Sequence, residues 1–139
     1  KPLVKIASGG ELARIMLAIK SVLSDTAPTA TLIFDEIDTG VSGRAAQKIA
    51  QKLAHISKKK QVICITHLAQ IAAMADTHLL IEKLEQQGKA STKVVVLDGE
   101  QRKGEIARII DGREASAAAL EHAQEMLDAA FELKQIELK

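Results

Sequence analysis

Three carboxylates follow one short apolar segment of this chain. Residues 31–34 read Thr-Leu-Ile-Phe, a run suited to a buried β-strand, and Asp35, Glu36 and Asp38 come directly after it. Adjacent like charges at the rim of a core cost free energy unless a cation compensates, and Mg²⁺ takes carboxylate oxygens while it holds nucleotide phosphates. Parallel strands of α/β proteins bind ligands at their C-terminal ends, so the pattern indicates a nucleotide hydrolase. The simpler alternative is a strand that ends in a polar turn, with Ser42 capping the next helix.

A second candidate for phosphate chemistry lies at residues 8–11, which read Ser-Gly-Gly-Glu. An apolar run with helical spacing follows over residues 12–23, and Ser8 with Glu11 three positions later has the form of a capping box. Glycine at positions 9 and 10 leaves the first backbone amides uncovered, and the bare N-terminus of a helix favours anions. An ordinary helix cap preceded by a flexible hinge explains the same residues.

A second predicted strand also ends on polar side chains. Residues 61–66 form a continuous β-branched run, as in buried parallel strands, and the run ends on Thr66-His67. Cys64 lies inside this run and is interpreted as a small buried hydrophobe.

The remaining pattern predicts an α/β fold with a mostly parallel sheet flanked by helices, a terminal hairpin and two C-terminal helices. The connection between the third and fourth strands is too short for a crossover helix, so these two strands form the hairpin. The other expected elements are a helix capped by Ser42 and ending at 58–60, a helix over 68–75, strands at 78–82 and 93–97, a helix over 105–110 ending at Gly112, and a last helix from Ser116.

Length and composition limit the class of protein. The 139 residues suffice for one domain with a real core, which must be built from Ala, Leu, Ile and Val because the chain has two Phe and no Trp or Tyr. The net charge of +1 gives no electrostatic case for nucleic-acid binding by the chain as a whole. A single cysteine excludes an internal disulfide and fits a reducing cytosol, and no apolar run approaches the roughly 18 residues of a membrane span. The start at Lys1-Pro2 rather than Met suggests a piece of a longer protein.

Taken in order, these motifs resemble the second half of an ATP-binding-cassette ATPase. Residues 8–11 resemble the signature motif, 32–36 the Walker B strand, 37–40 the D-loop, and His67 the switch histidine. Glutamate at position 11, where many cassettes have glutamine, is the form common among SMC and Rad-type chromosome-maintenance ATPases.

Longer stretches are similar to the RecN family of bacterial DNA repair proteins, namely residues 8–20, 34–44 and 64–76. Ala7 departs from the leucine typical of cassettes and agrees with this family. A Walker A loop is missing, because the nearest glycine pair, Gly99 and Gly104, is followed by neither the lysine nor the hydroxyl. The resemblance therefore implies that residues 1–139 form a single domain, the C-terminal half of a split ATPase head.

The resemblance also implies roles for single residues. Asp35 would hold Mg²⁺, usually through water, Glu36 would orient and deprotonate the attacking water, and His67 would contact the γ-phosphate or that water. Residues 8–11 would touch the γ-phosphate of ATP bound on a second head, and Asp38 would lie at the same dimer interface. ATP and Mg²⁺ are the implied cofactors, and neither is expected to bind tightly to this chain alone, which would be inactive by itself.

The implied partners are an N-terminal Walker A lobe, a second head in a homodimer, and DNA reached through the full-length protein, with no membrane and a cytoplasmic, nucleoid-associated location. The parent protein would hydrolyse ATP to ADP and phosphate and tether DNA at double-strand breaks. Three alternatives stay open: another SMC-like repair ATPase, a transporter ATPase, disfavoured by Glu11 and the missing Walker A, and a non-catalytic dimerisation lobe.

Other chemically tempting residues are expected to be structural. The spacing of the remaining histidines does not suit a metal, the methionines fall on helical faces that predict a core position, and two arginines next to the motifs are expected to be surface cations. These residues are His55, His78, His122, Met16, Met74, Met126, Arg14 and Arg44.

Overall fold

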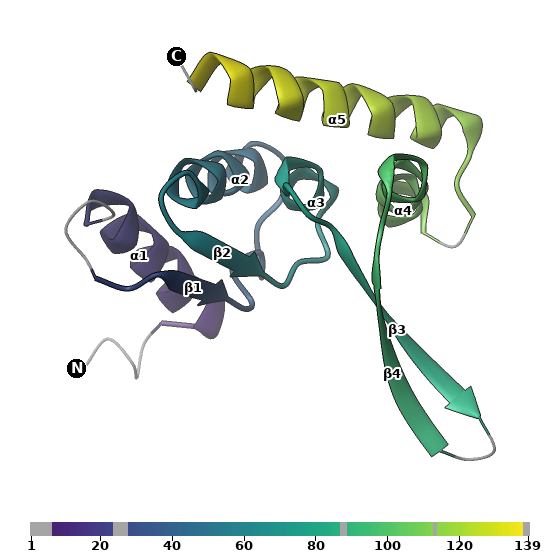
Figure 1. Ribbon diagram of the computed structural model, residues 1–139, viewed down its shortest axis with the longest axis horizontal. Coiled ribbons are helices and arrows are strands. Elements are labelled where there is room, and N and C mark those ends of the chain that lie inside the picture. Colours follow the sequence, from purple (N-terminus) through teal and green to yellow (C-terminus); the bar gives the residue numbers. More distant parts are fainter. Residues whose placement is uncertain (1–6, 24–27, 87–88, 113, 138–139) are drawn as a thin grey trace.

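Helices and strands alternate through the first half of the chain, and a hairpin and two helices complete it (Figure 1). The computed structural model describes residues 7–23, 28–86, 89–112 and 114–137. Their elements in order are α1 (Gly9–Val22), β1 (Thr31–Phe34), α2 (Gly43–Ser57), β2 (Gln61–Cys64), α3 (Ala69–Met74), β3 (Leu79–Gln86), β4 (Lys89–Val96), α4 (Gly99–Asp111) and α5 (Ala117–Glu137). The predicted α/β class, the hairpin and the two C-terminal helices are confirmed.

The β1 and β2 strands pair in parallel, with Ile33 opposite Ile63. Alternate side chains of β1 point to opposite faces, so Leu32 and Phe34 are buried while Ile33 is 69% exposed. The prediction of a fully buried strand was therefore wrong, because in the described residues this sheet has helices against one face only.

Two hydrophobic clusters hold the helices together, and α3 belongs to both. The first cluster joins α1, β1, α2 and α3 and contains Leu17, Leu32, Phe34, Ile37, Ile49, Ala50, Leu53, Ile56 and Ile71. The second joins α3, α4 and α5 and contains Ala69, Ala72, Ala73, Ile106, Ala107, Ala119 and Ala123. Small side chains let helices approach closely, and α5 runs across α3 and α4 in Figure 1.

The buried face of α1 is not its most apolar stripe. Leu17 and Gly10 are buried, whereas Met16 and Ile19 are each 45% exposed. The predicted core position of Met16 was therefore wrong, while Met74 and Met126 do pack against the clusters. The side of α1 that carries Gly10 and Leu17 faces inward because the N-terminal end of the helix lies close against the loop after β1.

Several element ends differ from the prediction. Ser42 occupies the N-cap position of α2 but makes no side-chain capping bond. The α4 helix begins at Gly99 rather than at 105, because Asp98 and Gln101 form a capping box that the sequence analysis missed, and it ends at Gly112 as predicted. Gly99 and Gly104 thus lie within a helix, which agrees with the missing Walker A loop.

The hairpin strands β3 and β4 are longer than predicted, and their antiparallel register pairs Leu79 with Val96. Residues 2–6, whose sequence suits an entering strand or a linker, and part of the segment 25–30, which ends the first predicted helix, lie outside the described residues. Within the described part of the chain, no helix is long and apolar enough to cross a membrane.

Candidate active site

The acidic loop, residues 35–39, turns sharply at the end of β1. Glu36 has a φ of 57°, which non-glycine residues seldom adopt, and its backbone N–H donates to Asp35 Oδ1 at 2.9 Å. The loop closes with a bond from the Thr39 N–H to the Glu36 carbonyl oxygen at 3.1 Å. Such a backbone conformation costs about 1–3 kcal/mol and persists where surrounding contacts impose it. Both adjacent carboxylates are exposed, as a ligand-binding role requires.

The N-terminus of α1 lies directly against this loop. The predicted capping box is present, with the Glu11 N–H donating to Ser8 Oγ at 3.3 Å and the Ser8 N–H donating to Glu11 Oε2 at 2.8 Å. A Cβ placed on Gly9 would lie 2.5 Å from Glu36 Oε2, and one on Gly10 would lie 2.8 Å from the Glu36 carbonyl oxygen. Gly10 is therefore required for the close approach of the helix to the loop backbone, whereas Gly9 faces only the movable end of the Glu36 side chain.

Arg14 joins the same two segments. Its Nη1 donates to the carbonyl oxygens of Ile37 at 3.2 Å and Thr39 at 2.8 Å. The prediction of a surface cation was wrong, since the side chain is half-buried and bonded across the helix–loop contact. The sequence spacing could have indicated this contact. Arg14 is four positions after Gly10, so the two residues lie on the same face of the helix.

Asp38 connects the acidic loop to the end of β2. Its side chain is 3% exposed, and Oδ2 accepts from Thr66 Oγ1 at 2.6 Å and from the His67 N–H at 2.9 Å. The same oxygen lies 3.1 Å from His67 Nδ1. A position of Asp38 at a dimer interface stays a prediction; within this chain its carboxylate faces inward and holds the Thr66–His67 segment.

This contact also orients the His67 imidazole. Nδ1 is the ring nitrogen that lies near this carboxylate, 3.1 Å from Oδ2. The His67 side chain is 73% exposed, which leaves it accessible to a ligand.

Asp35 can supply one carboxylate to the expected Mg²⁺ site. Its Oδ1 accepts the Glu36 N–H, and the residue is exposed. Among the described residues, no group of three His, Cys, Asp or Glu side chains could hold a metal ion. Mg²⁺ commonly binds one or two carboxylates together with waters and substrate phosphates, so one exposed aspartate suits a site completed by nucleotide.

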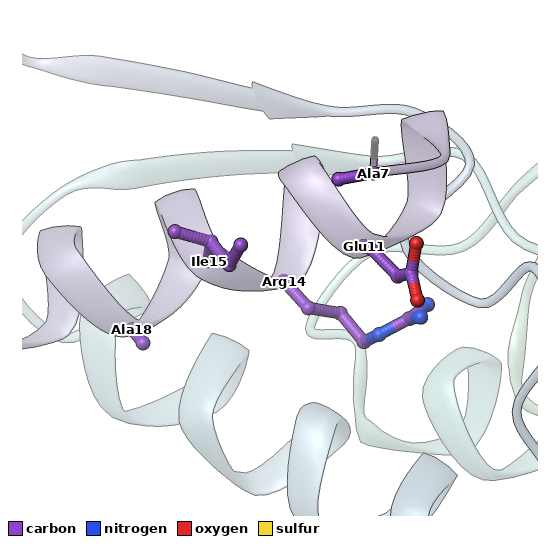
Figure 2. Close-up of a pocket in the computed structure, with 5 residues that line it drawn as sticks. All are labelled: Ala7, Glu11, Arg14, Ile15 and Ala18. Carbon is purple, nitrogen blue, oxygen red and sulfur yellow. The ribbon is translucent and has the colours of Figure 1, made fainter. Parts of the chain in front are cut away.

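An open hollow near these motifs runs along α1. Figure 2 shows its lining, Ala7, Glu11, Arg14, Ile15 and Ala18, with Arg14 reaching toward the Glu11 carboxylate. Hydrogen bonds from Ser8 hold the pKa of Glu11 below its usual value, and Arg14 adds to this effect. A depression lined by one helix and its leading residue cannot enclose a nucleotide, so the motifs present a surface rather than a closed pocket.

Known proteins similar to this chain are DNA repair proteins. A DNA repair protein RecN from Halalkalibacterium halodurans is 54% identical over 134 residues, which cover 96% of this chain and 24% of that protein. The corresponding protein of Bacillus subtilis is 51% identical, covering 96% and 23%, and that of Treponema pallidum is 50% identical, covering 93% and 22%. The chain belongs to the RecN family. It spans about a quarter of the length of these relatives.

A solved structure extends the likeness beyond RecN. It comes from work on the ATP-driven dimerization and DNA-stimulated activation of SMC ATPases, and it is 28% identical to this RecN-family chain. The TM-score is 0.55, and the alignment covers 78% of this chain and 65% of that one. No protein-family model matches the chain.

Proposed function

We propose that this chain is the C-terminal lobe of a RecN-type ATPase head, which hydrolyses ATP to ADP and phosphate once a Walker A lobe and a second head complete the site. The observation that supports it most strongly is the convergence of three motifs. The Ser8–Glu11 turn lies against Glu36, and Asp38 ties the same loop to His67. Residues far apart in sequence thus lie together at one polar site. The backbone of Glu36 has a strained conformation there.

Each group has a role that its position can support. Glu36 takes a proton from water as the water oxygen bonds the terminal phosphorus and the bond to the leaving ADP oxygen breaks. His67 is exposed, so its imidazole can reach the γ-phosphate or the attacking water. Asp35 would bind Mg²⁺, which neutralises phosphate charge when bound. The N-terminus of α1, where Gly9 is exposed, suits the γ-phosphate on a second head.

The exposed apolar side of the β1–β2 sheet agrees with a lobe that needs a partner. Ile33, Ile63 and Ile65 are large side chains at least partly exposed there, and an intact head would cover them with its Walker A lobe. The same surface would also suit a non-catalytic interaction lobe. The two functions differ in whether Glu36 matters for turnover.

The deciding experiment uses Glu36→Gln in the full-length protein. Gln keeps the size of the side chain but cannot act as a base, so ATP binding should persist while turnover falls by about 10²–10⁴-fold. Glu121→Gln on the exposed side of α5 is a matched control that should leave turnover unchanged. Undiminished hydrolysis by Glu36→Gln would remove the catalytic assignment and favour the interaction lobe.

A binding measurement tests the split head. Calorimetric titration of Mg-ATP into this chain alone should show no tight binding, and addition of the Walker A lobe should produce both binding and hydrolysis. Tight binding by the 139 residues unaided would contradict the proposal that the nucleotide site is completed by another lobe.

A further inference from the structure

We infer that Arg14 is a positioning residue, which fixes the spacing between the α1 N-terminus and the acidic loop and so sets where Glu36 lies. This inference rests on the proposed ATPase function for its effect on turnover. The contact on which it is based is a property of the chain and can be tested separately. None of the roles implied for the sequence motifs includes Arg14.

The Arg14 guanidinium group connects α1 to the acidic loop. Nη1 bonds two carbonyl oxygens that lie 23 and 25 residues further along the chain, at Ile37 and Thr39. A Cβ on Gly10 would approach this nitrogen to 3.1 Å and Thr39 Cβ to 3.1 Å. Arg14 therefore occupies the space that the absent side chain of Gly10 leaves open.

The other side of the acidic loop is already fixed. The Ile37 side chain is fully buried in the first cluster, and the Asp38 carboxylate holds Thr66 and His67. The Arg14 bonds flank Asp38 on both sides along the backbone. With both faces of the loop held, the strained conformation of Glu36 has little freedom to relax.

For the reaction, Arg14 would fix the position of the α1 N-terminus relative to Glu36. The α1 N-terminus would bind a phosphate on the second head, while Glu36 would act on the nucleotide of its own head. A displacement of about 1 Å in such a constellation can cost roughly 10²-fold in rate. Loss of the Arg14 bonds should therefore lower kcat more than it changes KM.

The test compares Arg14→Met and Arg14→Lys in the full-length protein. Met keeps an unbranched stem but has no donors, so kcat should fall about 10- to 100-fold with KM for Mg-ATP within about twofold. Lys restores a charged donor on a shorter stem without the planar fork, and its kcat should be intermediate. Lys52→Met removes one charge from the exposed side of α2 and should match the parent in kcat and KM.

Hydrogen exchange measured by mass spectrometry makes the test independent of ATP. Peptides covering residues 35–41 should exchange faster in Arg14→Met, while peptides from α2 stay unchanged. Unchanged exchange at 35–41, or faster exchange throughout the chain, would overturn the positioning role. So would undiminished kcat in Arg14→Met when the parent is active. An inactive parent would contradict the ATPase proposal, and the exchange result would still decide the role of Arg14.

Discussion

The side chains of the motif-bearing half of the molecule and those of the β3–β4 hairpin have opposite surroundings. In the first, polar side chains reach across elements, as Arg14 does to the acidic loop and Asp38 does to the Thr66–His67 segment. In the hairpin, Leu79, Ile81, Val94 and Val96 fall on one face of the two strands and all are exposed. Isolated two-stranded hairpins are marginal in water, and Figure 1 shows this one extending away from the helices.

The difference shows which part of the fold is complete within this chain. The buried polar groups of the motif loops have their hydrogen-bond partners within this chain. The contacts of this chain therefore determine the local geometry of the loops. The hairpin leaves apolar side chains exposed, as one side of the β1–β2 sheet does. A second arginine supports the comparison, since Arg102 Nη2 donates to the carbonyl oxygens of Ala72, Ala73 and Ala75 and so joins α4 to the end of α3.

The most damaging single change should be Asp38→Ala. It removes the acceptor from Thr66 Oγ1 and the His67 N–H while both remain near the core, at a cost of about 3 kcal/mol in the free energy of unfolding. Chemical denaturation of the full-length protein measures it, with Asp128→Ala on α5 as a control for loss of an acidic side chain. A loss below about 1 kcal/mol would mean that the buried polar contacts do not hold this half together.

Cys64 should be protected from alkylation. Burial, with smaller effects from Asp38 and Asp35, raises the pKa of its thiol from 9.0 to about 11. A raised pKa keeps the thiol neutral, so at pH 8 the folded chain carries about 100-fold less thiolate than the unfolded chain, and the thiolate is the reactive form. The reaction with iodoacetamide should accelerate at least that much in denaturant. Equal rates in the folded and unfolded chain would contradict the buried position of the sheet face that carries Cys64.

Replacing Gly10 should destabilise the chain more than replacing Gly9. The Cβ of Gly10→Ala meets the Glu36 carbonyl oxygen at 2.8 Å, and backbone must move, at about 1–2 kcal/mol. The Cβ of Gly9→Ala meets only the end of the Glu36 side chain, which can rotate away, so stability should change by about 0.5 kcal/mol or less. Thermal unfolding of both variants gives the order, and the reverse order would exclude the close approach of α1 to the acidic loop.

The smallest effect on stability should come from the hairpin. Val94→Thr and Val96→Thr keep the shape of side chains that are 59% and 65% exposed, so the free energy of unfolding should change by about 0.5 kcal/mol or less. Chemical denaturation of the two variants and the parent measures the change. A loss above about 2 kcal/mol would show that the hairpin face is covered within the chain and would remove the contrast between the two regions.

Most of the fold could be predicted from local patterns. The capping box at Ser8 and Glu11 and the strand at residues 31–34 were predicted because neighbouring residues determine them. The start of α4 was missed, although Asp98 and Gln101 also form a capping box, because the residues after it are polar. Met16 was misplaced because periodicity reveals that a helix has an apolar stripe but does not reveal which side of the helix faces the core.

By itself the sequence determined the motifs, their order along the chain and the residue types capable of phosphate chemistry. Only the tertiary structure decided that Arg14 bonds the acidic loop, that the Asp38 carboxylate faces inward, and that the His67 N–H bonds it. These are contacts between residues more than 20 positions apart, and they depend on how the elements pack. Local spacing carries no information about such distances, whereas the close packing of α1 against the acidic loop at Gly10 determines them.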